Sequence, residues 1–414
     1  MSQQTQTAKL LDTAGIVRKG EELDIQAISA WLQSQGLNLA DNANETAQVT
    51  QYSGGASNWT YRLEYKSDDP NKCHDLILRR PPAGTKAKSA HDMVREYQVQ
   101  HALQADYPYV PKMVALCTDE TVIGCDFYVM ERLEGIIPRA NFPKSLDLST
   151  EQTKTLCKNV LDAWIALHQI NTTNNAELSK LGKGDGYCER QITGWDKRYA
   201  KAHTPNVPTF ALVRDWLKNN IPADSKNCLI HNDWRLDNVV LDPTEPTKVI
   251  GVLDWEMATL GDPLMDLGSA LAYWVQADDD PVTQQFRRQP TNVAGMMTRQ
   301  QVVDYYLEKT GLKIDNWTFY EVYGLFRLAG IAQQIYYRYY HKQTDNPMFK
   351  DFWIVIHVLN ARCLAMIAKY ENNNHDNDFI NTIKADMQGA GLDDDMLANL
   401  PEQLQGLVKS MVFA

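Results

Sequence analysis

Alternation of apolar and polar residues dominates the first third of the chain. In residues 60–65 every second residue is a large apolar one, which is the period of a half-buried strand. Strands are also predicted at residues 76–80 and 127–131. Before them, residues 21–35 place their apolar residues near helical spacing, so we expect an N-terminal helix there.

Helical spacing takes over from about residue 150. The pattern predicts long helices at residues 150–168, 321–340 and 352–368. Two short apolar runs interrupt it, at 239–241 and 249–253, and we expect them to form a hairpin. Residues 187–195 show no helical or strand regularity. Strands followed by helices predict an α+β fold.

One loop before this hairpin has the spacing of a phosphotransferase site. His231, Asp233 and Asn238 form an H-x-D-x-x-x-x-N pattern, and Asp254 follows the second run. Moving a γ-phosphoryl group from ATP to a hydroxyl needs a carboxylate near the attacking oxygen and oxygen ligands for Mg²⁺. Asp233 is the candidate for the first role, and Asn238 with Asp254 for the second. His231 is expected to hold the loop's shape.

A purely structural interpretation of the same residues stays open at this point. His231 would then pack in a core, Asn238 would cap a turn, and Asp254 would cap the next helix. The Gly-rich turn before residue 60 is equally ambiguous. Its Gly55, Ser57 and Asn58 let backbone amides and small side chains approach phosphates, but two glycines before a strand also make an ordinary hairpin.

Six ordered blocks of sequence resemble the aminoglycoside phosphotransferase and choline kinase-like family, whose members share the protein-kinase-like fold. Within it, the chain is most similar to kinase-like proteins that are fused to or encoded near acyl-CoA dehydrogenases. The blocks lie at residues 51–65, 76–82, 89–97, 122–135, 187–195 and 229–267. The resemblance implies a bilobal molecule, with a small β-rich N-lobe at residues 1–134 and a larger helical C-lobe at residues 135–414.

The resemblance also implies further nucleotide-binding residues. Ser89 and Asp92 form a capping box for a helix that contains Glu96, and this helix would correspond to the kinase-like αC. Glu96 would then orient a cation from the neighbouring strand. Met130 and Glu131 lead into the segment expected to hold adenine by backbone hydrogen bonds, although Met130 could equally be a core residue.

The strand cation is where this chain departs from the family. A lysine is usual there, but no lysine lies between Lys72 and Lys86. Strand alternation assigns the position to Arg79 and turns Arg80 to the other face, although a one-residue shift would exchange them. Arginine can bind phosphate through two hydrogen bonds. The expected cofactors are therefore still ATP, or another nucleoside triphosphate, and Mg²⁺.

Composition narrows the partners and the location. The chain of 414 residues has a formal net charge of −11, which disfavours a nucleic-acid partner. Its first ten residues lack the pattern of a signal peptide, and residues 352–368 are interrupted by polar residues, so no membrane partner is expected. Seven cysteines without C-x-x-C spacing fit a reducing cytoplasm. Acidic clusters at 278–280 and 393–395 are expected to be solvated loops.

These observations predict an ATP-dependent kinase of a small hydroxylated molecule. Arg190, Lys197, Arg198 and Lys201 favour an anionic acceptor such as a hydroxyacyl-CoA over a polycationic aminoglycoside, although a solvated helix face is as good an explanation of these charges. Tyr187, Arg190 and Trp195 are candidates for substrate contact. An aminoglycoside kinase, a nucleotide-binding pseudokinase and a scaffold without nucleotide remain the alternatives. The oligomeric state is open.

Overall fold

The computed structural model describes residues 10–39, 47–52, 58–82 and 92–371. Gly55, Ser57, Ser89 and the acidic cluster at 393–395 lie outside these ranges. The chain divides into two compact units, and each is described by itself. The first comprises Met1–Leu181 with Leu236–Ala258, and the second comprises Gly182–Arg235 with Thr259–Ala414. The proposed lobe boundary at residues 134/135 is not a boundary between these units and stays a prediction.

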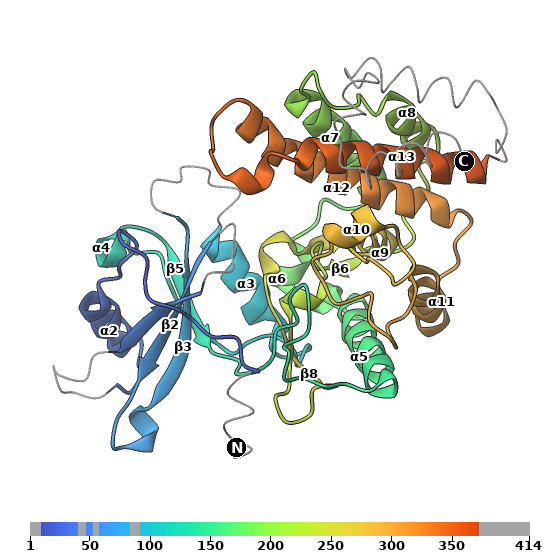
Figure 1. The fold of residues 1–414 in the computed structure, drawn as a ribbon. Coiled ribbons are helices and arrows are strands. Elements are labelled where there is room, and N and C mark those ends of the chain that lie inside the picture. Colours follow the sequence, from blue (N-terminus) through green and yellow to red (C-terminus); the bar gives the residue numbers. More distant parts are fainter. Residues whose placement is uncertain (1–9, 40–46, 53–57, 83–91, 372–414) are drawn as a thin grey trace. The chain divides into compact units, whose positions relative to one another are not determined.

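An antiparallel five-stranded sheet forms the centre of the first unit (Figure 1). Its strand order is β1-β2-β3-β5-β4. The strands are β1 (Gln48–Gln51), β2 (Trp59–Tyr65), β3 (His74–Arg80), β4 (Met113–Cys117) and β5 (Phe127–Glu131). The strands expected at 60–65, 76–80 and 127–131 are therefore confirmed.

The two faces of this sheet bury different side chains. One face packs Leu76 and Leu78 of β3 in a core that includes Ile28 and Leu32 of α2 (Ile25–Ser34). The other face packs Ile77 against Met93 of α3 (Met93–Leu103). Because successive strand residues point to opposite faces, Arg79 lies on the α3 face with Ile77.

The first unit contains further elements besides the sheet, α2 and α3. They are α4 (Glu120–Ile123), α5 (Thr150–His168), α6 (Ala176–Ser179), β7 (Val239–Leu241) and β8 (Val249–Val252), with short 3-10 turns at Pro70–Lys72, Thr172–Asn174, Leu236–Asn238 and Trp255–Met257. α5 begins at a capping box in which the Ser149 hydroxyl and the Gln152 side chain bond each other's backbone N–H groups. β7 and β8 pair as the expected hairpin.

Helices form most of the second unit. They are α7 (Tyr187–Ala202), α8 (Ala211–Asn219), α9 (Pro263–Leu271), α10 (Pro281–Gln285), α11 (Arg299–Thr310), α12 (Trp317–Tyr340) and α13 (Phe352–Tyr370), and a short turn lies at Pro347–Phe349. The strands β6 (Cys228–Ile230) and β9 (Thr259–Gly261) pair with each other. α12 packs against α13, α9 and α7. A Cβ atom on Gly324 would collide with the Gly268 backbone, so α9 and α12 approach closely only because both positions are glycine.

Two helices begin later in the sequence than predicted, and α12 begins earlier, at Trp317 instead of residue 321. The N-terminal helix begins at Ile25, because the Asp24 carboxylate caps it by accepting the Ala27 N–H. The helix that contains Glu96 begins at Met93, because Asp92 is its N-cap and accepts the Arg95 N–H. In both of the helices that begin late, an aspartate that follows the predicted start is the N-cap residue.

Residues 187–195 were expected to be irregular and instead open α7. The buried residues Tyr187, Cys188, Ile192, Trp195 and Tyr199 do recur at helical spacing. The start carries no local signal, however, because the helix is capped from a distance. The carboxylate of Asp224 accepts the backbone N–H groups of Tyr187 and Cys188 at 2.8 and 2.9 Å.

The acidic cluster at 278–280 is also not a simple solvated loop. Asp279 has a side chain only 10% exposed and forms a bidentate ion pair with Arg299 at 2.6 and 2.7 Å. Asp280 caps α10 by accepting the Thr283 N–H. The local pattern of three aspartates concealed a partner about twenty residues away.

The segment Pro347–Tyr370, which contains α13, is long and apolar enough to cross a membrane by length and composition alone, which is weak evidence. Two polar residues argue against a lipid-facing role. His357 and Asn360 are buried, and the His357 imidazole hydrogen-bonds the Asn206 carbonyl at 3.1 Å. α13 packs on α12 and α8 as an apolar helix of the protein core does.

Candidate functional site

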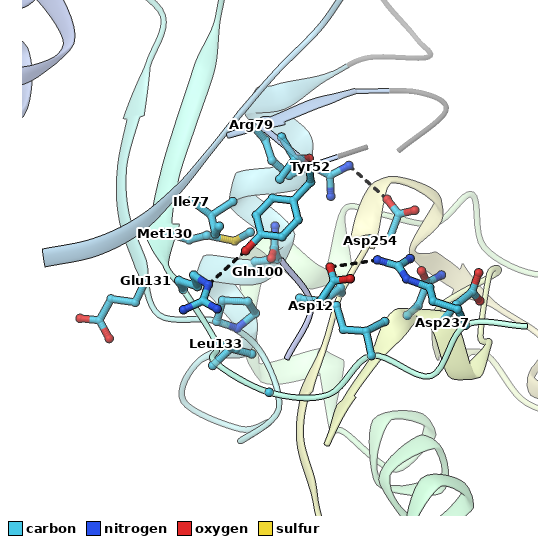
Figure 2. Close-up of a pocket in the computed structure, with 18 residues that line it drawn as sticks. Asp12, Tyr52, Ile77, Arg79, Gln100, Met130, Glu131, Leu133, Asp237 and Asp254 are labelled. Carbon is cyan, nitrogen blue, oxygen red and sulfur yellow. Dashed lines mark hydrogen bonds and ion pairs between the residues drawn. The ribbon is translucent and has the colours of Figure 1, made fainter. Parts of the chain in front are cut away.

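Arg79 is the centre of a charged network in the first unit. Its guanidinium lies 2.8 Å from the Glu96 carboxylate. It also lies 3.2 Å from the carboxylate of Asp254 (Figure 2). The Arg79 and Glu96 side chains are 10% and 1% exposed, whereas Asp254 is 32% exposed. Burial alone would lower the pKa of Arg79, but the Glu96 carboxylate, with Tyr128 and Asp254, raises it above its ordinary value. Arg79 is therefore a permanent cation in a buried position.

Arg80 has a different environment. Its guanidinium stacks over the Trp59 ring at 5.5 Å from the centroid, and its Nε–H donates to the Pro81 carbonyl. The register that assigns Arg79 to the α3 face is confirmed.

The hairpin of β7 and β8 brings two potential metal ligands together. The Leu253 N–H donates to the Asn238 carbonyl at 2.8 Å, and both Asn238 and Asp254 line one pocket. Asp254 adopts the left-handed backbone conformation, with φ of 66°, which non-glycine residues rarely use. The amide oxygen of Asn238 and the carboxylate of Asp254 are the hard oxygen donors that fit Mg²⁺.

The segment after Asp254 is held by contacts that the sequence did not reveal. Arg95 of α3 donates to the backbone carbonyls of Glu256, at 2.9 Å, and of Ala258. The Asn58 amide donates to the Glu256 carboxylate at 3.1 Å. The sequence offers one hint of this role of Arg95, namely its position next to Glu96, because its hydrogen-bond partners lie about 160 residues away.

The pocket beside this network has a second, less charged end. Ile77, Gln100, Met130, Glu131 and Leu133 line it there, and Tyr52 crosses it to reach Arg132 through its hydroxyl at 3.1 Å (Figure 2). Met130 is thus both a core residue and a pocket residue. The Arg132 N–H donates to the Asp75 carbonyl, but that of Leu133 has no protein acceptor within the described ranges. A backbone donor is available to a ligand at this end.

The loop with His231 and Asp233 belongs to the second unit and has its own supports. The fully buried Asp266 of α9 accepts the N–H groups of His231 and Asn232 at 3.1 and 2.8 Å. The His231 ring accepts the Asp233 N–H at 3.3 Å. The buried His231 thus contacts its own loop, and its role in holding the shape of this loop stays a prediction. Asp233 keeps a side chain 22% exposed, 3.6 Å from Arg235.

Asn232 has a backbone conformation that favours glycine. Its φ is 64°, in the left-handed region. Arg327 of α12 donates to its carbonyl at 2.8 Å, and the Tyr187 hydroxyl donates to its side chain at 3.2 Å. Tyr187, a candidate for substrate contact, is buried, and its hydroxyl contacts the loop. Asp266 and Arg327 were both missed because they come from later helices.

The basic residues of α7 have mixed environments. Arg190 donates to the carbonyls of Gly184 and Asp185, which occupies it at the start of the helix. Arg198 and Arg327 lie over the ring of Trp195, 4.7 and 5.5 Å from its centroid. Lys197 and Lys201 are exposed.

Another cluster in the second unit is structural. Cys188, Asp224 and Asp262 place potential ligand atoms within 4.8 Å of one another. However, Asp224 caps α7, and Asp262 caps α9 by accepting the N–H groups of Leu264 and Met265. The carboxylate oxygens are already occupied by backbone donors, and burial raises the pKa of the Cys188 thiol.

Comparison with known proteins gives one family. The model of the phosphotransferase enzyme family matches residues 48–298. The chain is 32% identical over 322 residues to acyl-CoA dehydrogenase family member 11 of Mus musculus, covering 77% of this chain and 40% of that protein. It is 33% identical over 330 residues to family member 10 of the same species, covering 78% and 29%. The chain thus spans two fifths or less of the length of these relatives.

Solved structures show the same fold. A structure from Ralstonia eutropha, described as a candidate aminoglycoside phosphotransferase, has a TM-score of 0.67 and 29% identity, covering 82% of this chain and 96% of that one. A GDP and kanamycin complex of an aminoglycoside 2″-phosphotransferase has a TM-score of 0.56 at 12% identity, covering 81% and 98%. The expected kinase-like α+β fold is confirmed.

Proposed function

Because the chain belongs to the phosphotransferase enzyme family, we propose that it transfers the γ-phosphoryl group of Mg-ATP to a hydroxyl group of a small molecule. The observation that carries the proposal is the buried Arg79–Glu96 pair beside Asp254. A cation held this firmly next to an acidic metal ligand suits a triphosphate, whose charge must be neutralised on both sides.

Each residue has a separate role in this proposal. Arg79 binds the α- and β-phosphates, and Glu96 orients it through their ion pair. Asn238 and Asp254 hold Mg²⁺, which supplies charge neutralisation for the phosphates when it is bound. Asp233 orients the acceptor hydroxyl and accepts its proton. The backbone N–H of Leu133, which lies beside Met130 and Glu131, donates a hydrogen bond to the adenine ring of the nucleotide.

The residues of the Gly-rich turn complete the phosphate end. Gly55, Ser57 and Asn58 remain proposed phosphate neighbours, of which only Asn58 falls within the described ranges. Its amide is bonded to Glu256. This contact links the turn to the segment that carries Asp254, which supports a common role in the phosphate site.

We propose a hydroxylated acyl-CoA or a related anionic metabolite as the acceptor. Arg235 lies 3.6 Å from Asp233, and Arg327 holds the carbonyl of the residue before it. These cations beside the proposed base favour an anion over a polycationic aminoglycoside. The two mouse relatives are named as acyl-CoA dehydrogenase family members, which also favours an acyl-CoA acceptor. The seven free thiols suit the proposed cytoplasmic location.

An acceptor screen tests this assignment. Purified protein is incubated with Mg²⁺ and ATP labelled in the γ-phosphate, together with a hydroxyacyl-CoA, kanamycin, or no acceptor. We expect label in the acyl-CoA product and none in kanamycin. Efficient labelling of kanamycin would overturn the acceptor and keep the kinase, whereas nucleotide binding without any transfer would favour the pseudokinase.

A further inference from the structure

The N-terminal segment of the chain runs beside the pocket of the first unit. Gly15 exchanges two backbone hydrogen bonds with Gln51 at the end of β1, at 2.8 and 2.9 Å. Three residues earlier, the Asp12 N–H donates to the Gly135 carbonyl at 3.4 Å. The segment is therefore fixed at two points, on the edge of the sheet and on the chain that follows β5.

This arrangement places a carboxylate in the pocket. Asp12 is one of the pocket-lining residues, and its side chain is 25% exposed. Arg139, which lines the same pocket, donates to the Asp12 carboxylate at 3.0 Å (Figure 2). Arg139 thus holds the Oδ2 atom of this carboxylate, while Oδ1 has no protein donor among the residues that the structure describes.

The position of Asp12 along the pocket decides what it would meet. Figure 2 shows it between Leu133, at the end proposed for the base, and Asp254, at the end proposed for the phosphates. A nucleoside triphosphate that spans these two ends has its ribose in between. A carboxylate accepts hydrogen bonds from vicinal hydroxyls, as acidic residues do in other nucleotide sites.

We propose that Asp12 binds the ribose hydroxyls of the nucleotide and that Arg139 positions it. This inference rests on the proposed nucleotide site and adds a ribose-selecting residue to it. The Arg139 cation also offsets the charge of Asp12, so that a carboxylate in the pocket does not repel the phosphates. The site would select ribonucleotides over deoxyribonucleotides.

A thermodynamic cycle tests the proposal by combining substitution of Asp12 with removal of the ribose hydroxyls from the nucleotide. Equilibrium binding of ATP and of 2′,3′-dideoxy-ATP is measured in the presence of Mg²⁺ for the wild-type chain and for Asp12→Asn. In the wild type we expect ATP to bind about 10-fold more tightly than the dideoxy analogue, which is the effect of charge-assisted hydrogen bonds. In Asp12→Asn this preference should fall to about 2-fold or less on the same grounds.

Glu22→Gln is the matched control. It removes an acidic charge from the same N-terminal segment, but Glu22 is exposed and its carboxylate accepts the Gly20 N–H. The ratio of its affinities for ATP and 2′,3′-dideoxy-ATP should equal that of the wild type. A general loss of folding lowers the affinity for both nucleotides together and leaves their ratio unchanged. An unchanged ratio in Asp12→Asn overturns the ribose contact, whereas failure of the wild type to bind either nucleotide overturns the proposed function.

Discussion

At the residue scale, the arginine in place of the usual lysine determines how the proposed nucleotide site is built. Arg79 contacts Glu96 and Asp254 at the same time, which a single ammonium group would do less readily. The buried carboxylate of Glu96 depends on this cation, because an unpaired buried charge is strongly destabilising. The departure from the family pattern is therefore compatible with the proposed activity.

Substitution of the two neighbouring arginines tests this assignment. Arg79→Ala should weaken ATP binding by about 10-fold or more, because charge-assisted phosphate contacts are lost. Arg80→Ala, which removes a residue stacked on Trp59, should change it by less than about 3-fold. Arg79→Lys keeps a cation and should recover part of the loss. Isothermal titration gives the affinities, and equal effects of the two alanine variants would refute the assignment of phosphate binding to Arg79.

The buried His357 should make the free energy of unfolding depend on pH. Burial lowers the pKa of His357 to about 4 from its ordinary value of 6.5. The unfolded chain therefore binds a proton at this residue between these values while the folded chain does not, so the free energy of unfolding decreases as the pH falls through this window. The contribution is about 3 kcal/mol at most.

His357→Gln isolates this contribution. The glutamine amide can still donate to the Asn206 carbonyl, but it does not titrate. Urea unfolding between pH 7 and pH 4 should show a shallower pH dependence for the variant than for the wild type. Parallel curves would mean that His357 is not the responsible group.

At the element scale, α3 supports the site through two adjacent residues. Glu96 acts on Arg79, and Arg95 fixes the backbone just after Asp254. Since Asp254 has an unfavourable left-handed conformation, its position depends on the segment that follows it. Arg95 is thus a positioning residue for the proposed metal ligand.

Arg95→Ala should raise the Mg²⁺ concentration needed for half-maximal activity by several-fold, because the Asp254 carboxylate is less well held. Gln98→Ala provides the control, because Gln98 is an exposed residue of the same helix. Phosphoryl transfer is measured across a Mg²⁺ titration at saturating ATP. If both variants have the same Mg²⁺ dependence, Arg95 has no positioning role.

The elements that sequence predicted correctly are those with local signals. The strand β2 has alternating residues, and α5 begins at the capping box formed by Ser149 and Gln152. The hairpin before Asp254 also followed from nearby residues. By contrast, α7 is capped by Asp224, and the loop of His231 is fixed by Asp266 and Arg327. Such partners are distant in sequence, so no local pattern identifies them.

At the scale of the whole molecule, family membership and site geometry support the same reaction. The family model covers residues 48–298, which include every proposed residue from Gly55 to Asp254. The relatives in mouse are much longer than this chain, so their complete activities do not transfer to it. The spacing of the H-x-D-x-x-x-x-N pattern pointed to a phosphotransferase, and the family model agrees with it, because the residues of this pattern are close together in sequence. The acceptor depends on surfaces assembled from many segments, which sequence order does not disclose.

The most direct test of the central claim is phosphoryl transfer by Asp233→Asn. The substitution removes the proposed base and little of the nucleotide contact, so Mg-ATP affinity should remain within about 3-fold of the wild type. Transfer to the acceptor identified in the screen should fall by at least about 100-fold, which is the low end for loss of general base catalysis. Turnover close to that of the wild type would contradict the account, because the chemistry would then not depend on Asp233.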